Sequence, residues 1–400
     1  MRTLLIAGIA ALALAAEGTA EDRLVAARLL AAYTFVHSGS GVVVDPSGLV
    51  VTNHHVIQHE DRHRLEVRFA NGRSYPVRLL GTDPVGDIAV LRIQRESAAG
   101  LEDHPGPFPS VDLAPADAIR PGIPVYAVGN PFGLGDVDSH PTLSRGVLST
   151  GRIVRDDYTD AIQVDAPVNP GNSGGPSFDA VGRLLGINGQ IRTTTGMRIN
   201  SGVGLAIASP QLAAFIPRLA AAEGGYVHHS QVPKGLDLDR DDDGVLVTAA
   251  PADGPLAVGD RILRINGRPA VSPTTAIGIC ASLPWKPGLT VPVDLRRGDA
   301  DLAVDLPLGR TTIPGQVWHG LTVTQAKDGL RVDRVDPGSS AEAAGIRPGD
   351  ILVRSGDQVL ERRVHFLKAL MGLEIGDHLP LTLRQDDGSA RDLRILLRQQ

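Results

Sequence analysis

The sequence contains a single cysteine, Cys280, in 400 residues, and this scarcity excludes an intrachain disulfide. The stability of the folded chain must therefore come from packed cores. An excess of positive charge is also missing: the net charge of -6 gives no sign of the basic stripe that binding to phosphate backbones requires, so nucleic acid is a poor partner. A phosphate-binding P-loop, a zinc cluster and a cofactor motif are all missing. We therefore expect an activity that uses neither metal nor cofactor.

Long apolar runs are missing after the first 20 residues, so no later stretch is predicted to cross a membrane. The N-terminus itself has Arg2, an apolar run over residues 4–16 and small residues at 18–20, the pattern of an export signal. This run is shorter than the roughly 20 residues that span a bilayer. We expect cleavage after Ala20, a periplasmic location and no stable membrane insertion, with a retained N-terminal anchor as the alternative. Export without disulfides suggests a bacterial protein.

Turn-forming residues are abundant, since 46 Gly and 29 Pro separate short apolar runs. The length suits two to three domains. The runs predict a mainly β chain that begins with a sandwich or barrel, and they cover residues 33–36, 42–44, 49–51, 65–69, 75–80, 88–93, 125–128, 146–148, 161–164, 184–187 and 203–207. A helix should follow, capped by Ser209 with Pro210 at its first position and ending near Ala222. Pro217 should kink or shorten this helix.

A polar, glycine-containing stretch at 224–233 is expected to be a linker, and the sequence after it repeats weakly. GDRIL at 259–263 matches GDILV at 349–353, at an offset of 90 residues. Each copy should form a small α+β module, the first over 234–310 and the second over 316–400.

The two copies differ in their helices. The first is expected to have a helix capped by Ser272, and the second a helix over 363–371. In the first copy 7 residues separate Pro251 from Gly259, whereas 11 separate Pro337 from Gly349 in the second. A short helix is therefore expected to be missing from the first copy.

The motif NPGNSGGP at 169–176 concentrates glycine around one serine, Ser173. Glycines let the backbone turn sharply and direct the amides of Gly171 and Ser173 to one point, as the stabilisation of an oxyanion requires. A serine hydroxyl also needs a positioned base to become a nucleophile. On its own the motif fits an ordinary turn between strands, so the interpretation depends on whether partners are present.

Two upstream motifs supply such partners, TNHHV at 52–56 and DIAVL at 87–91. The imidazole of His55 suits proton transfer near neutral pH, and the carboxylate of Asp87 could fix its tautomer. The order His, Asp, Ser, over a turn-rich β unit that ends in a helix, is that of the chymotrypsin-type double barrel.

These motifs, together with GNPFGLG at 129–135 and the tandem modules, resemble the HtrA/Deg family of periplasmic trypsin-fold serine proteases with C-terminal PDZ domains. The resemblance implies a chymotrypsin-like double β-barrel protease domain over 21–223 and two small α+β PDZ-like domains. It implies Ser173 as nucleophile, His55 as general base and acid, Asp87 as orienting carboxylate, and the amides of Gly171 and Ser173 as the oxyanion hole. It further implies ATP-independent cleavage of unfolded or damaged proteins through an acyl-enzyme, in cell-envelope quality control, by a homotrimer or a multiple of trimers.

The neighbouring histidines offer alternatives. His54 is the rival base, although the family pattern Thr-Asn-x-His-Val selects His55. His55, His59 and His63 are spaced by four, which could align them on one helical face as metal ligands. No glutamate follows His55 to complete a zinc-peptidase motif, so we expect no metal site there.

The sequence departs from the family pattern at three places, one of which is the segment before Gly39, where the long regulatory insertion of some members is missing. Gly86 precedes Asp87 where members usually carry Ser or Thr, so a hydrogen bond that supports this aspartate is expected to be absent. Ser177 and Phe178 replace an aliphatic pair after the Gly-Gly-Pro of the serine motif. These changes concern regulation more than chemistry.

The specificity can be predicted from position 167, six residues before Ser173. Trypsin-fold enzymes that cleave after Arg or Lys carry an acid there, and this chain has Pro167. A basic substrate side chain would find no partner. We therefore predict cleavage after Val, Ala, Leu or Ile, with small or aliphatic pocket walls at Ile187, Asn188, Gly189 and Val203.

PDZ-like modules bind extended peptides as an added strand and hold the terminal carboxylate on the amides of a glycine-containing loop. The candidate loop residues are Gly235, Leu236, Gly320 and Leu321. We expect unfolded polypeptides and protein C-termini as partners, although each module could instead only pack on its neighbours. The competing function is a proteolytically silent, peptide-binding holdase or scaffold. Tyr33 and Phe35 are candidates either for a trimer contact or for buried core.

Overall fold

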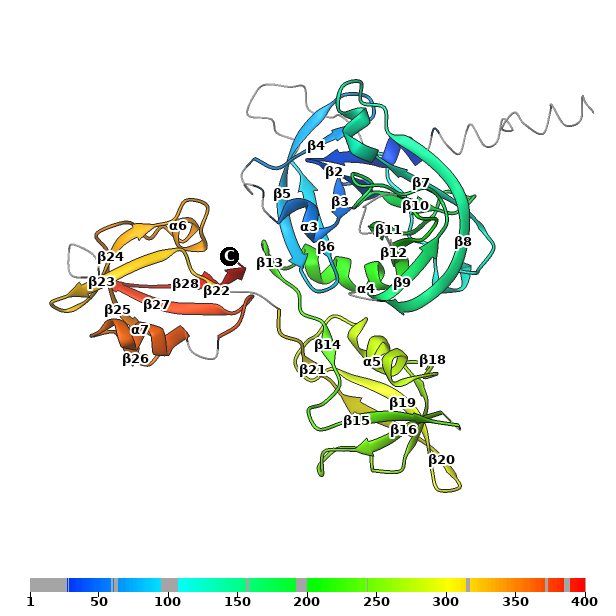
Figure 1. The fold of residues 1–400 in the computed structure, drawn as a ribbon. Helices are drawn as coiled ribbons and strands as arrows, with labels where there is room; N and C mark the ends of the chain where they lie inside the picture. The colour runs from blue at the N-terminus through cyan, green and yellow to red at the C-terminus, as the bar shows by residue number, and fades with distance from the viewer. Residues whose placement is uncertain are drawn as a thin grey trace, which may run out of the picture.

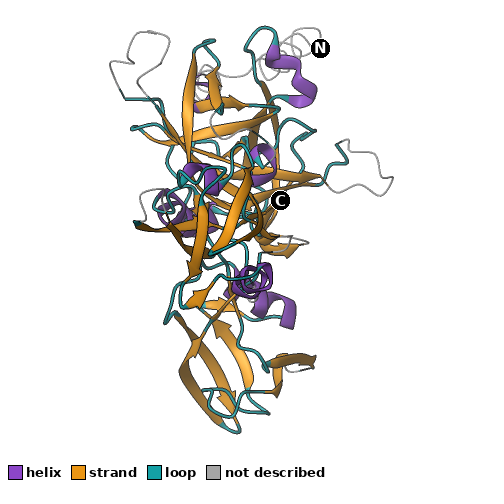
Figure 2. Ribbon diagram, turned by 90° about the vertical axis from the view of Figure 1, so that its left-hand side faces the viewer, coloured by secondary structure: helices purple, strands orange, loops and turns teal. Residues whose placement is uncertain are grey.

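The structure, a computed structural model, describes residues 27, 29–58, 60, 64–94, 107–155, 158–191, 200–242, 244–313, 317–370, 373–384 and 389–399. The predicted export signal at 1–20 lies outside these residues. In the described part of the chain, no helix is both long and apolar enough to cross a bilayer. Strands dominate the architecture, with helices confined to a few short segments (Figure 2).

The first barrel is a closed sheet of six antiparallel strands. Its order is β5-β4-β1-β2-β3-β6, and pairing of β5 with β6 closes the ring. The strands are β1 (Tyr33–Val36), β2 (Gly39–Asp45), β3 (Leu49–Thr52), β4 (Glu66–Phe69), β5 (Ser74–Asp83) and β6 (Ile88–Ile93), and the short helix α3 (His54–Ile57) follows β3. Closure pairs the strand edges and lets the inward-facing residues fill the interior.

The second barrel is also closed, in the order β10-β11-β12-β9-β8-β7. Its strands are β7 (Pro124–Gly129), β8 (Thr142–Arg155), β9 (Tyr158–Val164), β10 (Pro176–Phe178), β11 (Leu184–Ile191) and β12 (Gly204–Ala208), with 3₁₀ segments η1 (Ala116–Ala118) and η2 (Pro131–Asp136). The two barrels lie side by side (Figure 1). Together they confirm the predicted double-barrel class.

One apolar core joins the barrels and the helix that follows them. Tyr33 and Phe35 of β1, 0% and 3% exposed, belong to it with Ile187 and Phe215. The two aromatics that were candidates for a trimer contact are therefore core residues of the chain itself.

The closing helix α4 (Ser209–Ala220) buries Leu212, Phe215, Ile216 and Leu219, as its periodicity predicts. Ser209 is not the N-cap. Ala208 holds that position, while the Ser209 hydroxyl lies inside the helix and donates to the Ala114 carbonyl at 2.7 Å. The prediction of a serine cap is wrong because this hydroxyl ties the helix to the chain before β7 instead. Pro217 lies within the helix, which ends three residues later.

The stretch predicted to be a linker is bound at both ends. Strand β13 (Gly225–Tyr226) pairs in parallel with β5 of the first barrel, and Val227 N–H donates to the Thr82 carbonyl at 3.0 Å. Strand β14 (Ser230–Gln231) pairs with β21 (Gly309–Arg310) of the first module.

The two C-terminal modules share one topology, which bears out the sequence repeat (Figure 1). Module 1 has strand order β15-β16-β17-β19-β20, and module 2 has β23-β24-β25-β27-β28. Module 1 consists of β15 (Asp237–Asp241), β16 (Gly244–Ala249), β17 (Arg261–Ile265), β18 (Arg268–Pro269), α5 (Pro273–Ala281), β19 (Thr290–Arg297), β20 (Ala300–Pro307) and β21. Module 2 consists of β22 (Val317–Trp318), β23 (Leu321–Ala326), β24 (Gly329–Val335), α6 (Ser340–Ala343), β25 (Ile351–Ser355), β26 (Gln358–Val359), α7 (Arg363–Leu370), β27 (His378–Arg384), β28 (Ala390–Leu396) and β29 (Arg398–Gln399).

The helices of the modules follow the sequence predictions. The Ser272 hydroxyl caps α5 by accepting from Thr275 N–H at 3.1 Å. Helix α7 covers the predicted segment as far as Leu370, and Met371 lies outside the described residues. Residues 251–259 of module 1 contain no helix, whereas module 2 has α6 in the corresponding place. The predicted loss of a short helix from module 1 is therefore confirmed.

Module 1 rests on the second barrel through its helix and an ionic cluster. Gly278 of α5 faces Val154 of β8 closely enough that a Cβ there would clash. Asp160 of β9, 1% exposed, pairs with Arg152 at 2.6 Å and with Arg268 of β18 at 3.4 Å. A buried carboxylate with two guanidinium partners fixes this contact, because loss of either partner would leave charge poorly compensated.

Candidate active site

His55 lies in the first turn of α3, directly after β3. Its Nδ1 is 2.8 Å from Oδ2 and 3.0 Å from Oδ1 of Asp87, and its own backbone N–H donates to Oδ1 at 3.0 Å. The His55 side chain is 41% exposed and that of Asp87 16% exposed. The carboxylate therefore fixes both the backbone and the ring of His55, with Nδ1 as the protonated nitrogen and Nε2 left for other chemistry.

Asp87 ends the turn between β5 and β6, in the left-handed region at φ 59°. This strained conformation is held by its neighbours, because the Asp87 carbonyl accepts from Asn53 Nδ2 at 2.9 Å and from His54 N–H at 3.2 Å. Tyr158 begins β9 in the second barrel, and its hydroxyl donates to Oδ2 of Asp87 at 3.1 Å. The support expected to be lost with glycine at position 86 thus comes from elsewhere in the fold.

Tyr158 is the residue that the sequence did not point to. Residues 156 and 157 before it lie outside the described part, and its own position shows no motif; only the pairing of the two barrels brings it to Asp87. The predicted strand begins only at residue 161, whereas β9 begins at Tyr158, whose side chain is 1% exposed.

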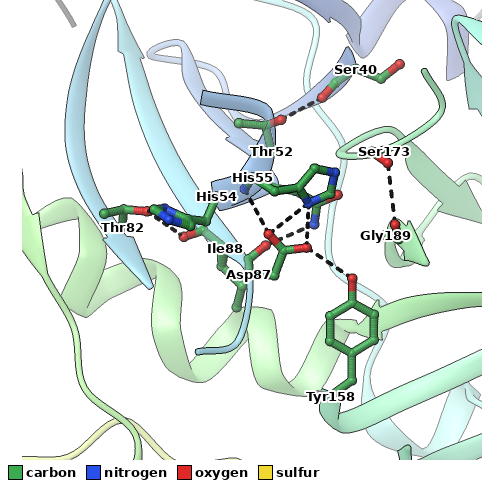
Figure 3. Close-up of polar contacts among 11 residues, drawn as sticks. Ser40, Thr52, His54, His55, Thr82, Asp87, Ile88, Tyr158, Ser173 and Gly189 are labelled. Atoms are coloured by element: carbon green, nitrogen blue, oxygen red, sulfur yellow. Dashed lines mark hydrogen bonds and ion pairs between the residues drawn. The ribbon is translucent and has the colours of Figure 1, made fainter. Parts of the chain in front are cut away.

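His54, the rival base, points away from the Asp87 carboxylate (Figure 3). Its Nδ1 lies 2.7 Å from the Thr82 hydroxyl, and the residue is 7% exposed. Of the two histidines, His55 is the one whose ring contacts the Asp87 carboxylate in the described part of the chain.

The serine loop lies against the first barrel, beside the start of α3. Ser40 N–H donates to the Ser173 carbonyl at 2.9 Å, and a Cβ on Gly174 would meet Thr52 Oγ1 at 2.3 Å and Asn53 N at 3.0 Å. Asn53 directly precedes α3, so these contacts bring the serine loop to the helix that carries His55.

The amides of the loop divide into two groups. Those of Asn172, Gly174 and Gly175 donate to backbone carbonyls at 2.8–3.0 Å. Within the described ranges the amides of Gly171 and Ser173 donate no hydrogen bond. These two are the predicted oxyanion donors.

The orientation of the Gly171 amide is set by its own peptide unit. The Pro170 carbonyl accepts from Phe132 N–H of η2 at 2.8 Å, and in a trans peptide the N–H points opposite to the C=O. Gly171 has φ +98°, and a Cβ there would lie 2.1 Å from the Asn130 carbonyl. Both facts require glycine at this position.

The Ser173 hydroxyl has one hydrogen bond among the described residues, to the Gly189 carbonyl at 3.4 Å. Among the described residues no hydrogen bond joins His55 to Ser173, and Figure 3 shows the imidazole between Asp87 and Ser173. Nucleophile and base contacts are often long without substrate and shorten only in the substrate complex.

The predicted pocket residues differ in whether their side chains or their backbone face the serine loop. The side chains of Ile187 and Asn188 are 0% and 1% exposed, and the Asn188 amide oxygen accepts from the Ser177 hydroxyl at 2.7 Å. Their side chains belong to the interior of the fold, so they do not line an open wall. Gly189 faces Ser173 through its carbonyl, and Val203 is half-buried.

The predicted metal alternative at the histidines gains no support. Helix α3 ends at Ile57, while His59 and His63 lie outside the described residues. Across the described residues, no three His, Cys, Asp or Glu side chains gather in a way that could hold a metal ion.

The candidate peptide loop of module 1 lies in a turn, and that of module 2 directly precedes and enters β23. Gly235 and Gly320 have φ +84° and +75°, and Leu236 and Leu321 are 8% and 7% exposed. In module 1 a cavity of about 270 Å³ lies beside Leu236, lined mainly by prolines and leucines. In module 2 the Leu321 amide donates to His319 Nδ1 at 3.1 Å. Burial lowers the pKa of His319, partly offset by the charge of Asp336, which favours the neutral ring that can accept this bond.

Comparison with known proteins agrees with this geometry. The model of the trypsin-like peptidase domain matches residues 39–187, and that of the PDZ domain matches residues 319–397. A probable periplasmic serine endoprotease, DegP-like, from Brucella suis biovar 1 (strain 1330) is 32% identical over 377 residues, covering 85% of this chain and 69% of the relative. The periplasmic serine endoprotease DegP of Escherichia coli (strain K12) is 29% identical over 364 residues, covering 84% and 72%.

Solved structures show the same relationship. The HtrA-type protease AlgW with tripeptide superposes with a TM-score of 0.55 at 26% identity, over 72% of this chain and 97% of that chain. With a trypsin-like domain, a PDZ domain and a relative of this similarity along most of its length, the chain belongs to the HtrA/DegP family of serine proteases.

Proposed function

We propose that this protein is an ATP-independent serine endopeptidase that cleaves unfolded or damaged proteins in the periplasm through an acyl-enzyme. The observation that carries the proposal is the His55–Asp87 pair beside a serine loop whose Gly171 and Ser173 amides are not used within the described fold. Nothing in this chemistry requires a nucleotide or a metal, because a base, a nucleophile and oxyanion donors suffice for acyl transfer.

In the proposed mechanism the Ser173 hydroxyl attacks the substrate carbonyl while His55 Nε2 takes its proton. Asp87 accepts the Nδ1–H bond and stabilises the imidazolium that forms. The carbonyl oxygen becomes an oxyanion that accepts from the amides of Gly171 and Ser173. His55 then gives its proton to the leaving amine, and a water molecule, deprotonated by the same ring, releases the acyl group from Ser173.

We propose cleavage after Val, Ala, Leu or Ile, because Pro167 provides no charge for a basic side chain. Peptides that differ only at the residue before the cleaved bond test this proposal. Faster cleavage after Arg than after Val would contradict it.

The modules are proposed to bind extended peptides and protein C-termini, in module 1 through Gly235 and Leu236 and in module 2 through Gly320 and Leu321. The related AlgW structure contains a tripeptide, and PDZ domains bind peptides by strand addition. We also propose a trimer or a multiple of trimers and a periplasmic location; relatives of this chain are named as periplasmic enzymes.

The central experiment is casein hydrolysis by the wild type and by Ser173→Ala, with labelling by a serine-directed phosphonate. We expect both hydrolysis and labelling to disappear in the variant. Ser144→Ala, whose hydroxyl donates to the Pro167 carbonyl in the second barrel, is the control and should keep both. Hydrolysis that persists in Ser173→Ala would contradict the nucleophile, and a wild type that is never labelled, even with peptide added, would favour the holdase alternative.

A further inference from the structure

A fully buried ion pair joins the turn that carries Asp87 to the segment between the barrels and module 1. His229 Nε2 lies 2.6 Å from Asp83 Oδ2, and both side chains are 0% exposed. The Phe215 ring of α4 packs on the imidazole, with ring centroids 4.5 Å apart. This pair lies outside the site described above and has no role in the acyl-transfer chemistry.

The contacts of the ring define its protonation. His229 Nδ1 is 2.5 Å from the Ala281 carbonyl, which can only accept, so Nδ1 carries a proton. Nε2 faces the Asp83 carboxylate, another acceptor. Burial by itself lowers the pKa of His229, but the Asp83 charge and the two hydrogen bonds outweigh it and raise the pKa. The acceptors beside both ring nitrogens therefore suit a doubly protonated ring at His229.

On one side, Asp83 organises the turn that ends at Asp87. Asp83 closes β5, and its Oδ1 accepts from Val85 N–H at 3.1 Å and from Gly86 N–H at 2.9 Å. A Cβ on Gly86 would lie 2.3 Å from Asp83 Oδ2 and 2.6 Å from His229 Nε2. This packing explains why glycine precedes Asp87 here, since any side chain would displace the pair.

On the other side, the backbone around His229 is hydrogen bonded to module 1 and the residue that follows β21. The His229 carbonyl accepts from Thr311 N–H at 3.0 Å, and Ser230 N–H donates to the Leu283 carbonyl at 2.9 Å. The ring itself is bonded to Ala281, the last residue of α5. A shift of α5 would therefore move the partner of Asp83.

We propose that His229 is a positioning residue: with Asp83 it holds the turn that places Asp87 against His55, and through Ala281 it makes that placement depend on how module 1 is seated. This proposal depends on the proposed function at one point, the role of Asp87 in orienting a catalytic base. His229 touches no substrate and acts only through Asp83 and the turn.

The test compares His229→Leu, which removes both ring contacts, with His229→Gln, whose amide can still donate to Asp83. The matched control is His228→Leu, because the neighbouring ring is also buried but bonds to the Thr311 carbonyl and not to the turn. We expect His229→Leu to lower kcat by about tenfold or more with KM changed less than about twofold, since positioning acts on the chemical step. His229→Gln should recover part of this loss, and His228→Leu should keep the kcat of the wild type.

A second measurement needs no turnover. The proton that His55 Nδ1 donates to Asp87 gives a low-field NMR signal, which should shift or broaden in His229→Leu and stay unchanged in His228→Leu. Because it reports geometry, it decides the inference even if the chain hydrolyses nothing. If His229→Leu fails to fold, His229→Gln is tested by the same two measurements, and its changes in kcat and in the NMR signal should be smaller than those expected for His229→Leu. A wild-type signal and kcat in the His229 variants, or equal losses in His228→Leu, would overturn the proposal.

Discussion

Replacement of Gly86 by alanine tests the packing of the Asp83–His229 pair directly. The backbone of Gly86 lies outside the positive-φ region, so alanine is compatible with its conformation. The added Cβ would lie 2.3 Å from the Asp83 carboxylate, which cannot swing aside because it is buried and bonded to His229, Val85 N–H and Gly86 N–H. Overpacking of this kind lowers stability by about 1–3 kcal/mol, and separation of the pair would raise the loss to about 3–5 kcal/mol.

A loss of about 3 kcal/mol corresponds to a fall in Tm of roughly 6–12 °C for a unit the size of the double barrel. Differential scanning calorimetry measures this fall. Gly309→Ala is the control, because its nearest neighbours are atoms of the flexible Gln231 side chain at 3.3 Å, and its Tm should stay within about 2 °C of the wild type. A Gly86→Ala protein that melts with the wild type would refute the close packing and, with it, the explanation for glycine at this position.

Three further predictions follow from single contacts. Tyr158→Phe removes the hydroxyl that donates to Asp87 and should lower kcat/KM by about tenfold with little change in fold; an unchanged value would mean that the other donors suffice. Burial raises the pKa of Cys280 to about 12, so iodoacetamide at pH 8 should modify it only in denaturant, and rapid labelling of the native protein would contradict this. Because the pKa of His229 is raised in the folded state, its contribution to stability is complete below about pH 6.5 and is lost as the pH rises through the folded pKa. The difference in unfolding free energy between the wild type and His229→Gln should therefore shrink from pH 6 upward. A difference that grows with pH would contradict a raised pKa.

The fold follows from local sequence to a large degree. Short apolar runs between Gly and Pro predicted the strands of both barrels except β10, which lies within the serine motif. The Gly-Asp repeat predicted two modules of one topology, with the short helix missing from the first. These features depend on residues close together in the chain, where periodicity and turn chemistry are informative. Ser209 shows the limit, because its hydroxyl bonds to Ala114, 95 residues away, instead of to its own helix.

The candidate site divides in the same way. Ser173, His55 and Asp87 stand in recognisable motifs, and their proposed roles come from those motifs. Tyr158 and His229 stand in none, because they reach the site only after the barrels pair and the segment after α4 returns to β5. Single residues that act across 71 and 146 positions of sequence leave no local pattern.

The pairing of β13 with β5 determines where the chain can be truncated to give an isolated double barrel. Sequence composition places the cut at residue 223, but a fragment that stops there loses the strand beside Gly81 and Thr82 and the imidazole that pairs with Asp83. A fragment that continues through Gln231 retains both. A truncated enzyme of the shorter length would therefore be impaired by the position of the cut, and its weakness would be mistaken for evidence that the modules themselves are needed for catalysis.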